Sequence, residues 1–171
     1  IKLNPEIQQA PWKTLKLIWG KDYWWPRQET LAYRPIVSTS YLLNWSVLGS
    51  GRHDRESEQV IGFHWLNLAG HGINAILAYF LIWKLLRRHW AAFFSAGLFA
   101  VHPIATESVT NIIGRADLFV TMSFLGCTLL YIRSTETQGF RRIPGLFVVM
   151  VLLAAGCLSK ELAPAFLAVP I

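Results

Sequence analysis

The segment of residues 102–117, HPIATESVTNIIGRAD, holds the densest group of side chains that could do chemistry. Arg115 could meet an anionic headgroup or a phosphate, because its planar guanidinium donates two parallel hydrogen bonds. Glu107 or Asp117 could then orient Arg115, bind an acceptor or act as a base. The alternative is that these charges only pair with one another at the end of a helix. His102 is followed by proline and is expected to end the preceding helix.

Two shorter motifs carry further charges, Tyr33-Arg34-Pro35 and Ser159-Lys160-Glu161. Lys160 could hold a phosphate as a point charge. It could instead pair with Glu161 and extend its ammonium group to the membrane surface. Both interpretations remain open from the sequence.

A polar stripe runs through the most apolar part of the chain, formed by His64, Asn67, His71 and Asn74. These positions share one helix face, and polar groups that face lipid are costly, so the stripe should face protein or a wet cavity. It could hydrogen-bond to other helices, line a substrate groove or, least favoured, ligate haem together with His89 or His102. The HExxH, CxxC and P-loop patterns are absent from the sequence, which predicts no cofactor and no metal site.

The elements that position these groups are predicted to be membrane helices. Of the 171 residues, 53% are hydrophobic and only 15% are charged, against about 25% charged in soluble domains. The composition excludes a disordered chain and a disulfide scaffold, and it disfavours a soluble globule. Cys127 and Cys157 lie inside apolar runs and are interpreted as small hydrophobic residues.

Two regions follow from this pattern. Residues 1–60 are predicted to be an outer loop with interfacial helices that begin near Pro5 and at Pro11, and residues 50–58 to be a surface loop. Residues 61–171 are predicted to be a transmembrane bundle. Its expected spans are 61–83, 90–101, 118–132, 143–158 and a truncated span from 162.

Orientation follows from the short connections at 84–90 and 133–142, which hold six Lys or Arg residues against Glu136 alone. The positive-inside rule places these connections in the cytoplasm. The polar motifs then all lie at the outer side, as an outward-facing site would require. The chain has no initial methionine and ends in an apolar run, so we expect a segment of a longer protein. The alternative is a short chain whose tail packs against a partner.

The order of the motifs resembles one family. A YRP segment follows an aromatic loop, a polar span comes next, and HPIATESVTNIIGRAD and SKE follow in that order. This arrangement resembles the membrane region of the transmembrane and tetratricopeptide-repeat O-mannosyltransferases and their bacterial relatives, in the GT-C superfamily of glycosyltransferases. The resemblance covers residues from about Asn4 to Glu161, and its most specific piece is the spacing of HP, TE and GRAD.

The resemblance implies an all-α integral membrane protein, a partial GT-C-like helical bundle with interfacial amphipathic helices in an outer loop. It implies inverting transfer of a sugar, with mannose expected, from a polyprenyl-phosphate donor to a protein hydroxyl. Arg115, Lys160 and Arg34 are expected to bind the donor phosphate. Glu107 and Asp117 are candidates for the acceptor site or for catalysis. Groove-lining or supporting candidates are Tyr33, His64, His71, His102 and Glu161.

The family's acidic pair, the usual candidate for the catalytic base, precedes a stretch like Asn4-Pro5, and the chain begins just after that place. We therefore expect this chain to lack the base, the first span and the tetratricopeptide repeats. Asp22 has no matching position. The expected partners are membrane lipids, the polyprenyl-phosphate sugar, an acceptor protein and other subunits of a membrane complex, without nucleic acid.

Two other functions remain open from the sequence alone: a non-catalytic structural subunit of a larger membrane complex, and an electron-transfer subunit with haem on its histidines. The expected location is the endoplasmic reticulum membrane for a eukaryotic source and the cytoplasmic membrane for a bacterial one.

Overall fold

The computed structural model describes residues 11–21, 23, 32–48, 56–136 and 138–161, and the regular structure of these residues is entirely helical. The α-helices are α1 (Pro11–Ile18), α2 (Pro35–Leu48), α3 (Glu56–Leu86), α4 (His89–Val101), α5 (Ala105–Thr110), α6 (Arg115–Thr135) and α7 (Arg142–Cys157). Two short 3-10 turns, η2 (Ile112–Gly114) and η3 (Gly139–Arg141), precede α6 and α7.

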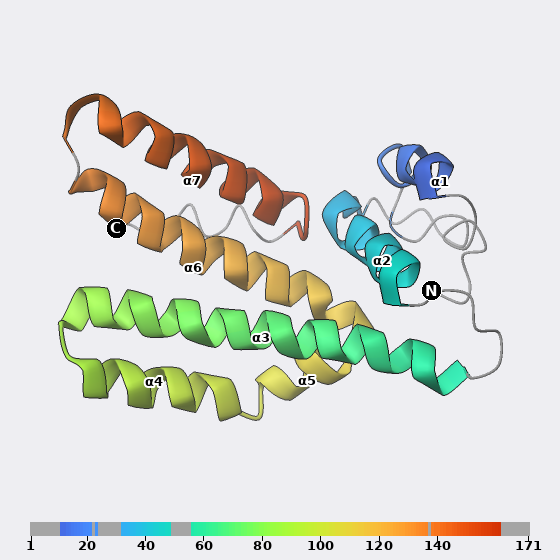
Figure 1. The fold of residues 1–171 in the computed structure, drawn as a ribbon, viewed down its shortest axis with the longest axis horizontal. Coiled ribbons are helices and arrows are strands. Elements are labelled where there is room, and N and C mark those ends of the chain that lie inside the picture. The colour runs from blue at the N-terminus through green and yellow to red at the C-terminus, as the bar shows by residue number, and fades with distance from the viewer. Residues whose placement is uncertain (1–10, 22, 24–31, 49–55, 137, 162–171) are drawn as a thin grey trace.

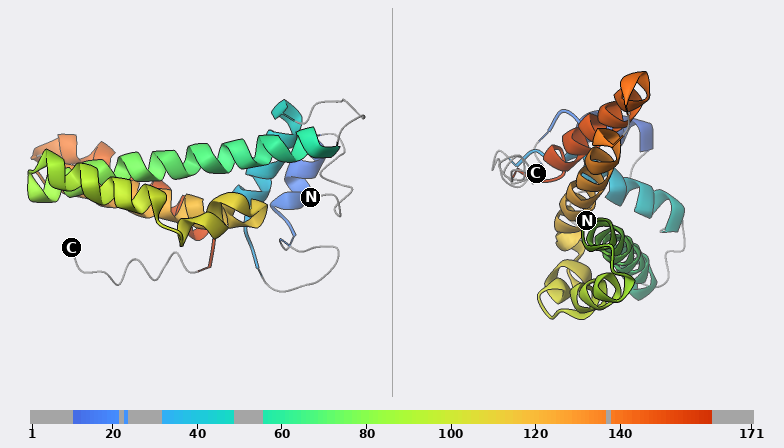
Figure 2. Two further views of the ribbon diagram at one scale, coloured as in Figure 1. Left: turned by 90° about the horizontal axis from the view of Figure 1, so that it is seen from below. Right: turned by 90° about the vertical axis from the view of Figure 1, so that its left-hand side faces the viewer.

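Four helices form an elongated bundle. α4, α3, α6 and α7 lie in that order as a row, each antiparallel to its neighbour in the chain (Figures 1 and 2). α2 packs across α3 and α6 near one end of the row, and α1 lies against α2 (Figure 1). As a result, the end of α7 comes close to the beginning of both α6 and α2.

Two helical segments are long and apolar enough to cross a membrane, 61–86 with 26 residues and 112–135 with 24. α4 has 13 residues and α7 has 16, below the usual length of a span of about 20. α4 ends where His102 turns extended, with φ −65° and ψ 131°, before Pro103. α5 then continues along α3 (Figure 1).

The predicted helices are largely confirmed by the structure. α4 and α7 match the expected ranges to within one residue at each end, and α1 begins at Pro11 as expected. α6 extends three residues at each end beyond the expected span, into the GRAD motif and beyond residue 132. The expected helix near Pro5 and the expected span from residue 162 lie outside the described residues.

The predicted surface loop at 50–58 is wrong at its end, because α3 already begins at Glu56. Residues 49–55 lie outside the described part of the chain.

α2 was not predicted, although Pro35 stands at its first position, where proline suits a helix. Two of its hydroxyl groups donate within the helix, that of Thr39 to the carbonyl of Pro35 at 2.7 Å and that of Ser40 to the carbonyl of Val37 at 2.7 Å. Four buried side chains join α2, α3 and α6 in one apolar cluster: Val37, Tyr41, Phe63 and Ala116.

Candidate functional site

Three of the sequence motifs meet at one end of the bundle. Tyr33-Arg34-Pro35 leads into α2, residues 115–117 open α6, and Ser159-Lys160-Glu161 follows α7. Because α7 runs antiparallel to α6, the residues after α7 lie beside the first turn of α6 (Figure 1). Motifs that are far apart in the sequence are therefore brought into contact.

The first contact is the ion pair between Arg34 and Glu161. Arg34 Nε donates to Glu161 Oε1 at 3.1 Å, and Arg34 Nη2 donates to Glu161 Oε2 at 2.9 Å. The Arg34 guanidinium also lies 5.4 Å from the centre of the Tyr23 ring. The hydrogen bond from Arg34 holds the pKa of Glu161 below its usual value, and the same bond raises the pKa of Arg34.

The second contact is the ion pair between Lys160 Nζ and Asp117 Oδ1. The Lys160 side chain is 24% exposed and that of Asp117 is 46% exposed. One interpretation of the sequence paired Lys160 with Glu161. In the structure these consecutive residues have different partners, Asp117 on α6 for Lys160 and Arg34 before α2 for Glu161. These cross-motif pairs leave all four charged groups close to solvent.

Arg115 is placed differently, since it is only 1% exposed. Its Nε donates to Asn67 Oδ1 at 2.9 Å, and its Nη2 donates to Asn44 Oδ1 at 2.9 Å and to the Phe63 carbonyl at 3.2 Å. Its Nη1 lies 3.4 Å from both the carbonyl and the hydroxyl oxygen of Ser40. Every hydrogen-bond partner of Arg115 in the described part of the chain is thus a neutral oxygen.

Two aromatic rings enclose the same guanidinium. Its central carbon lies 4.7 Å from the Tyr41 ring centre and 5.4 Å from that of Phe63, which favours cation–π attraction. Arg115 therefore joins α2, α3 and α6. Pairing of Arg115 with Glu107 or Asp117, an alternative from the sequence, is absent from the contacts of the described residues. A phosphate could reach this guanidinium only after its present hydrogen bonds were broken.

The polar stripe on α3 forms hydrogen bonds with neighbouring segments. Asn67 Nδ2 donates to the Asn111 carbonyl at 3.0 Å, and Asn74 Nδ2 donates to the Leu118 carbonyl at 3.0 Å. His71 Nε2 lies 3.0 Å from the carbonyl oxygen of Ala100. These contacts link α3 to the segments packed against it, as interhelical hydrogen bonding by the stripe would require, and the groove stays a prediction.

The remaining predicted residues are dispersed. His102 Nδ1 accepts a hydrogen bond from the Ile104 amide at 3.2 Å, and its side chain is exposed at the end of α4. Glu107 is exposed on α5, His64 is half-buried on α3, and the Tyr33 hydroxyl donates to the Trp19 carbonyl at 2.9 Å. Among the described residues, no group of three or more His, Cys, Asp or Glu could hold a metal ion, and both cysteines are free.

Several site residues were not predicted. Tyr41 is 3% exposed and donates to the Ile112 carbonyl at 2.7 Å, and burial raises its pKa well above the usual value. Ser40 and Asn44 supply acceptors for Arg115. Their spacing of four residues within an apolar segment was the available signal, because such residues share a helix face.

Acidification should selectively weaken the Arg34–Glu161 contact. Because the folded pKa of Glu161 is lowered, its contribution to stability is full above the ordinary carboxyl pKa of roughly 4.3 and is lost as pH falls through the folded value. Glu161→Gln should cost up to about 1 kcal/mol of unfolding free energy at neutral pH, since the pair is partly exposed. Thermal unfolding of both forms across the pH range should show this difference shrinking in acid.

An Arg34→Gln background provides the control for this experiment. There the effect of Glu161→Gln should be small and nearly independent of pH. A difference that persists unchanged below the ordinary carboxyl pKa would contradict the ion pair.

The fold and the contacts of the described residues define the class of protein. It is helical, with two candidate membrane helices and two ion pairs at one end of the bundle.

Comparison with known sequences identifies the family. The chain is 32% identical over 152 residues to the Caenorhabditis elegans protein O-mannosyl-transferase F38B6.6, covering 84% of this chain. It is 32% identical over 179 residues to human protein O-mannosyl-transferase TMTC2, covering 99% of this chain, and 34% identical over 135 residues to Drosophila melanogaster Tmtc2, covering 77%. The chain belongs to the TMTC family.

This chain spans 20% of the length of the Caenorhabditis elegans and human TMTC2 relatives and 14% of the Drosophila one. No family model and no solved structure matches the chain. The predicted resemblance to this family is confirmed by the sequence relatives.

Proposed function

We propose that this chain is a section of a membrane glycosyltransferase. It would take part in moving a sugar, with mannose expected, from a polyprenyl-phosphate donor to a protein hydroxyl on the lumenal or periplasmic side. The observation that carries the proposal is the meeting of the YRP, GRAD and SKE motifs in two cross-motif ion pairs. The names of the relatives, protein O-mannosyl-transferases, support the same class of reaction.

In this proposal Lys160 and Arg34 bind the donor phosphate. Both cations are partly exposed, and each contacts a carboxylate, Asp117 for Lys160 and Glu161 for Arg34. Phosphate oxygens could take the positions of these carboxylate oxygens, because both groups accept charged hydrogen bonds. Arg115 then acts through the fold, because its buried guanidinium fixes the helix that carries Asp117. Direct binding of the phosphate by Arg115 stays a prediction that requires its present contacts to open.

The chemistry is a displacement at the anomeric carbon. The acceptor hydroxyl oxygen attacks this carbon while the bond between carbon and the phosphate oxygen breaks, and the polyprenyl phosphate leaves with the electron pair. Cations at the phosphate stabilise the negative charge that develops on the leaving group. The hydroxyl proton passes to a base, for which Asp117 and Glu107 are the candidates within this chain.

The sidedness of the proposal depends on the two ends of the bundle. The turns between α3 and α4 and between α6 and α7 lie at one end of the bundle (Figure 1). The Arg34–Glu161 and Lys160–Asp117 pairs, which we call the ion-pair cluster, lie toward the other end. If the basic turns are cytoplasmic, the cluster faces the lumen or the periplasm. The membrane would be that of the endoplasmic reticulum in a eukaryote and the cytoplasmic membrane in a bacterium.

Lys160→Gln in the full-length protein tests the proposal. We expect sugar transfer from the polyprenyl-phosphate donor to fall about a hundredfold or more, as when an electrostatic stabiliser of a developing charge is removed. Transfer of radiolabelled mannose to an acceptor peptide, in membranes with matched protein amounts, measures the effect.

Lys84→Gln is the matched control, because Lys84 forms a comparable ion pair with Glu136 at 2.5 Å toward the opposite end of the bundle. It should leave transfer nearly unchanged. Full activity in a folded Lys160→Gln variant would contradict the proposal and favour a non-catalytic structural subunit. An equal loss in both variants would also contradict the site assignment.

A further inference from the structure

The end of the bundle opposite the ion-pair cluster is rich in arginine. The turns between α3 and α4 and between α6 and α7 lie there side by side (Figure 1). Glu136 is the acidic residue of these turns, and it is paired with Lys84 at 2.5 Å. Arg87, Arg88 and Arg142 have exposed side chains at this end. The positive charge of the turns is therefore not neutralised by their own acid.

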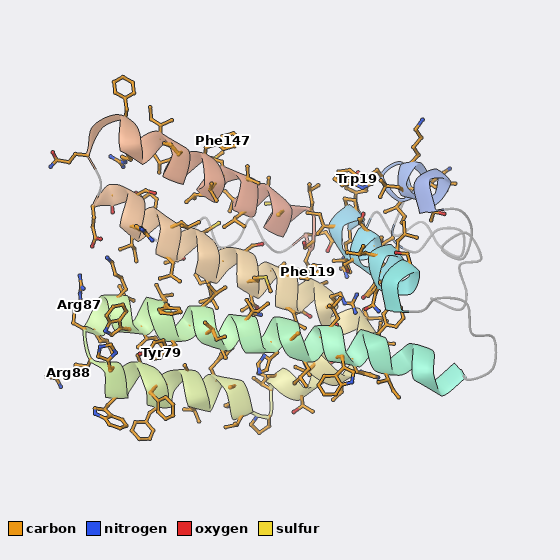
Figure 3. All side chains as sticks on the ribbon, in the orientation of Figure 1. Trp19, Tyr79, Arg87, Arg88, Phe119 and Phe147 are labelled. Carbon is orange, nitrogen blue, oxygen red and sulfur yellow. The ribbon has the colours of Figure 1, made fainter. Side chains whose placement is uncertain are left out.

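The backbone of the α3–α4 turn presents two consecutive arginines at this end of the bundle. Arg87 has φ 55°, in the left-handed region, which costs free energy in a residue other than glycine. This conformation ends α3 and allows α4 to begin at His89. Arg88 extends from the turn away from the bundle, whereas Arg87 extends along this end toward the α6–α7 turn (Figure 3), close enough for its charge to act on Glu136.

Exposed aromatic rings lie beside these arginines. Trp90 is 75% exposed and Phe94 is 67% exposed, and their rings stack with centres 6.2 Å apart. Phe140, in the turn between α6 and α7, is 90% exposed. Aromatic residues of this kind gather at the boundary between the apolar core of a membrane and its headgroups.

We propose that this end of the bundle binds the headgroups of anionic phospholipids. We call it the basic end and define it by Arg87, Arg88, Arg142, Trp90 and Phe140. Guanidinium groups donate paired hydrogen bonds to phosphate oxygens, and the adjacent rings contact the upper acyl chains. A free phosphate would use the arginines but not the exposed rings. The inference is independent of the proposed glycosyltransferase function, which concerns the other end.

Lipid titration of the protein in phosphatidylcholine mixed micelles tests this proposal, with phosphatidylserine as the probe and native mass spectrometry as the readout. Wild-type protein should bind phosphatidylserine more tightly than added phosphatidylcholine. Arg87→Gln/Arg88→Gln should weaken phosphatidylserine binding about tenfold to thirtyfold, the effect of two basic residues at an anionic surface. Arg87→Lys/Arg88→Lys should keep most of the affinity, because it preserves the charge.

Lys16→Gln/Lys21→Gln is the matched control, since it removes the same charge from exposed residues at and just beyond α1. It should leave the affinity within about twofold of wild type. Equal affinity of wild type for the two lipids would overturn the proposal, as would an equal loss in the control. Displacement of phosphatidylserine by an equal concentration of inorganic phosphate would assign the arginines to free phosphate and would also overturn it. Should the Gln variant fail to fold by circular dichroism, Arg142→Gln provides the same test on α7.

Discussion

Arg115→Met should destabilise the protein by about 3–5 kcal/mol of unfolding free energy, because several buried acceptors lose a charged donor at the same time. The guanidinium is 1% exposed and donates to oxygens on α2 and α3. Methionine fills much of the volume but leaves these acceptors without their donor, and each buried unsatisfied polar group costs about 1–3 kcal/mol. Reversible denaturant unfolding in detergent measures the difference.

Two further variants show whether charge or geometry is responsible. Arg115→Lys should recover part of the stability, because an ammonium keeps the charge but cannot donate in a planar fork to Asn44 and Asn67 together. Arg133→Met, at an exposed position in the last turn of the same helix, should change the unfolding free energy by less than about 1 kcal/mol. A loss at Arg115 no larger than at Arg133 would show that the guanidinium does not hold the helices together.

Gly114→Ala should have the second large effect, a loss of about 1–3 kcal/mol or a displaced start of α6. A Cβ at this position would lie 2.5 Å from the Ser108 carbonyl oxygen, 2.6 Å from Ser108 Cα and 2.8 Å from its carbonyl carbon. These are backbone atoms of α5, so no side-chain rotation relieves the overlap. The φ of Gly114, −61°, suits alanine, so the expected loss of unfolding free energy comes from steric overlap and not from backbone strain.

Gly72→Ala on α3 is the appropriate comparison, because no atom lies within 4 Å of the added Cβ. Alanine in the middle of a helix is more favourable than glycine by up to about 1 kcal/mol, so this variant should be neutral or stabilising. Equal unfolding free energies for the two variants would refute the close approach of α5 to the start of α6.

The helices of the bundle could be predicted because their signals are local. Apolar runs with basic connections defined α3, α4, α6 and α7 to within a few residues at most ends, and Pro11 marked the start of α1. α2 was missed because its three serines and its threonine made it look less apolar than it is. The hydroxyl groups of Thr39, Ser40 and Ser46 donate to carbonyls of the same helix, so their polarity costs little in the fold.

The charged contacts of the site could not be predicted, because they join distant parts of the chain. Arg34 and Glu161 are separated by 127 positions, and Asp117 and Lys160 by 43. The sequence shows which charges exist but not which elements bring them together. The burial of Arg115 was hidden for a related reason. A cation at the end of an apolar helix is usually exposed, and the oxygens and rings that make its burial tolerable come from α2 and α3, far away in the sequence.

Lys160 and Glu161 are consecutive residues, yet one is bonded to α6 and the other to the segment that leads into α2. The two residues leave the backbone at neighbouring Cα atoms, about 3.8 Å apart, so a single point of the chain after α7 contacts two other elements. Lys160 attaches this point to the first turn of α6, and Glu161 attaches it to the residue that precedes α2. The residues that follow α7 therefore join three helices of the bundle through charge alone.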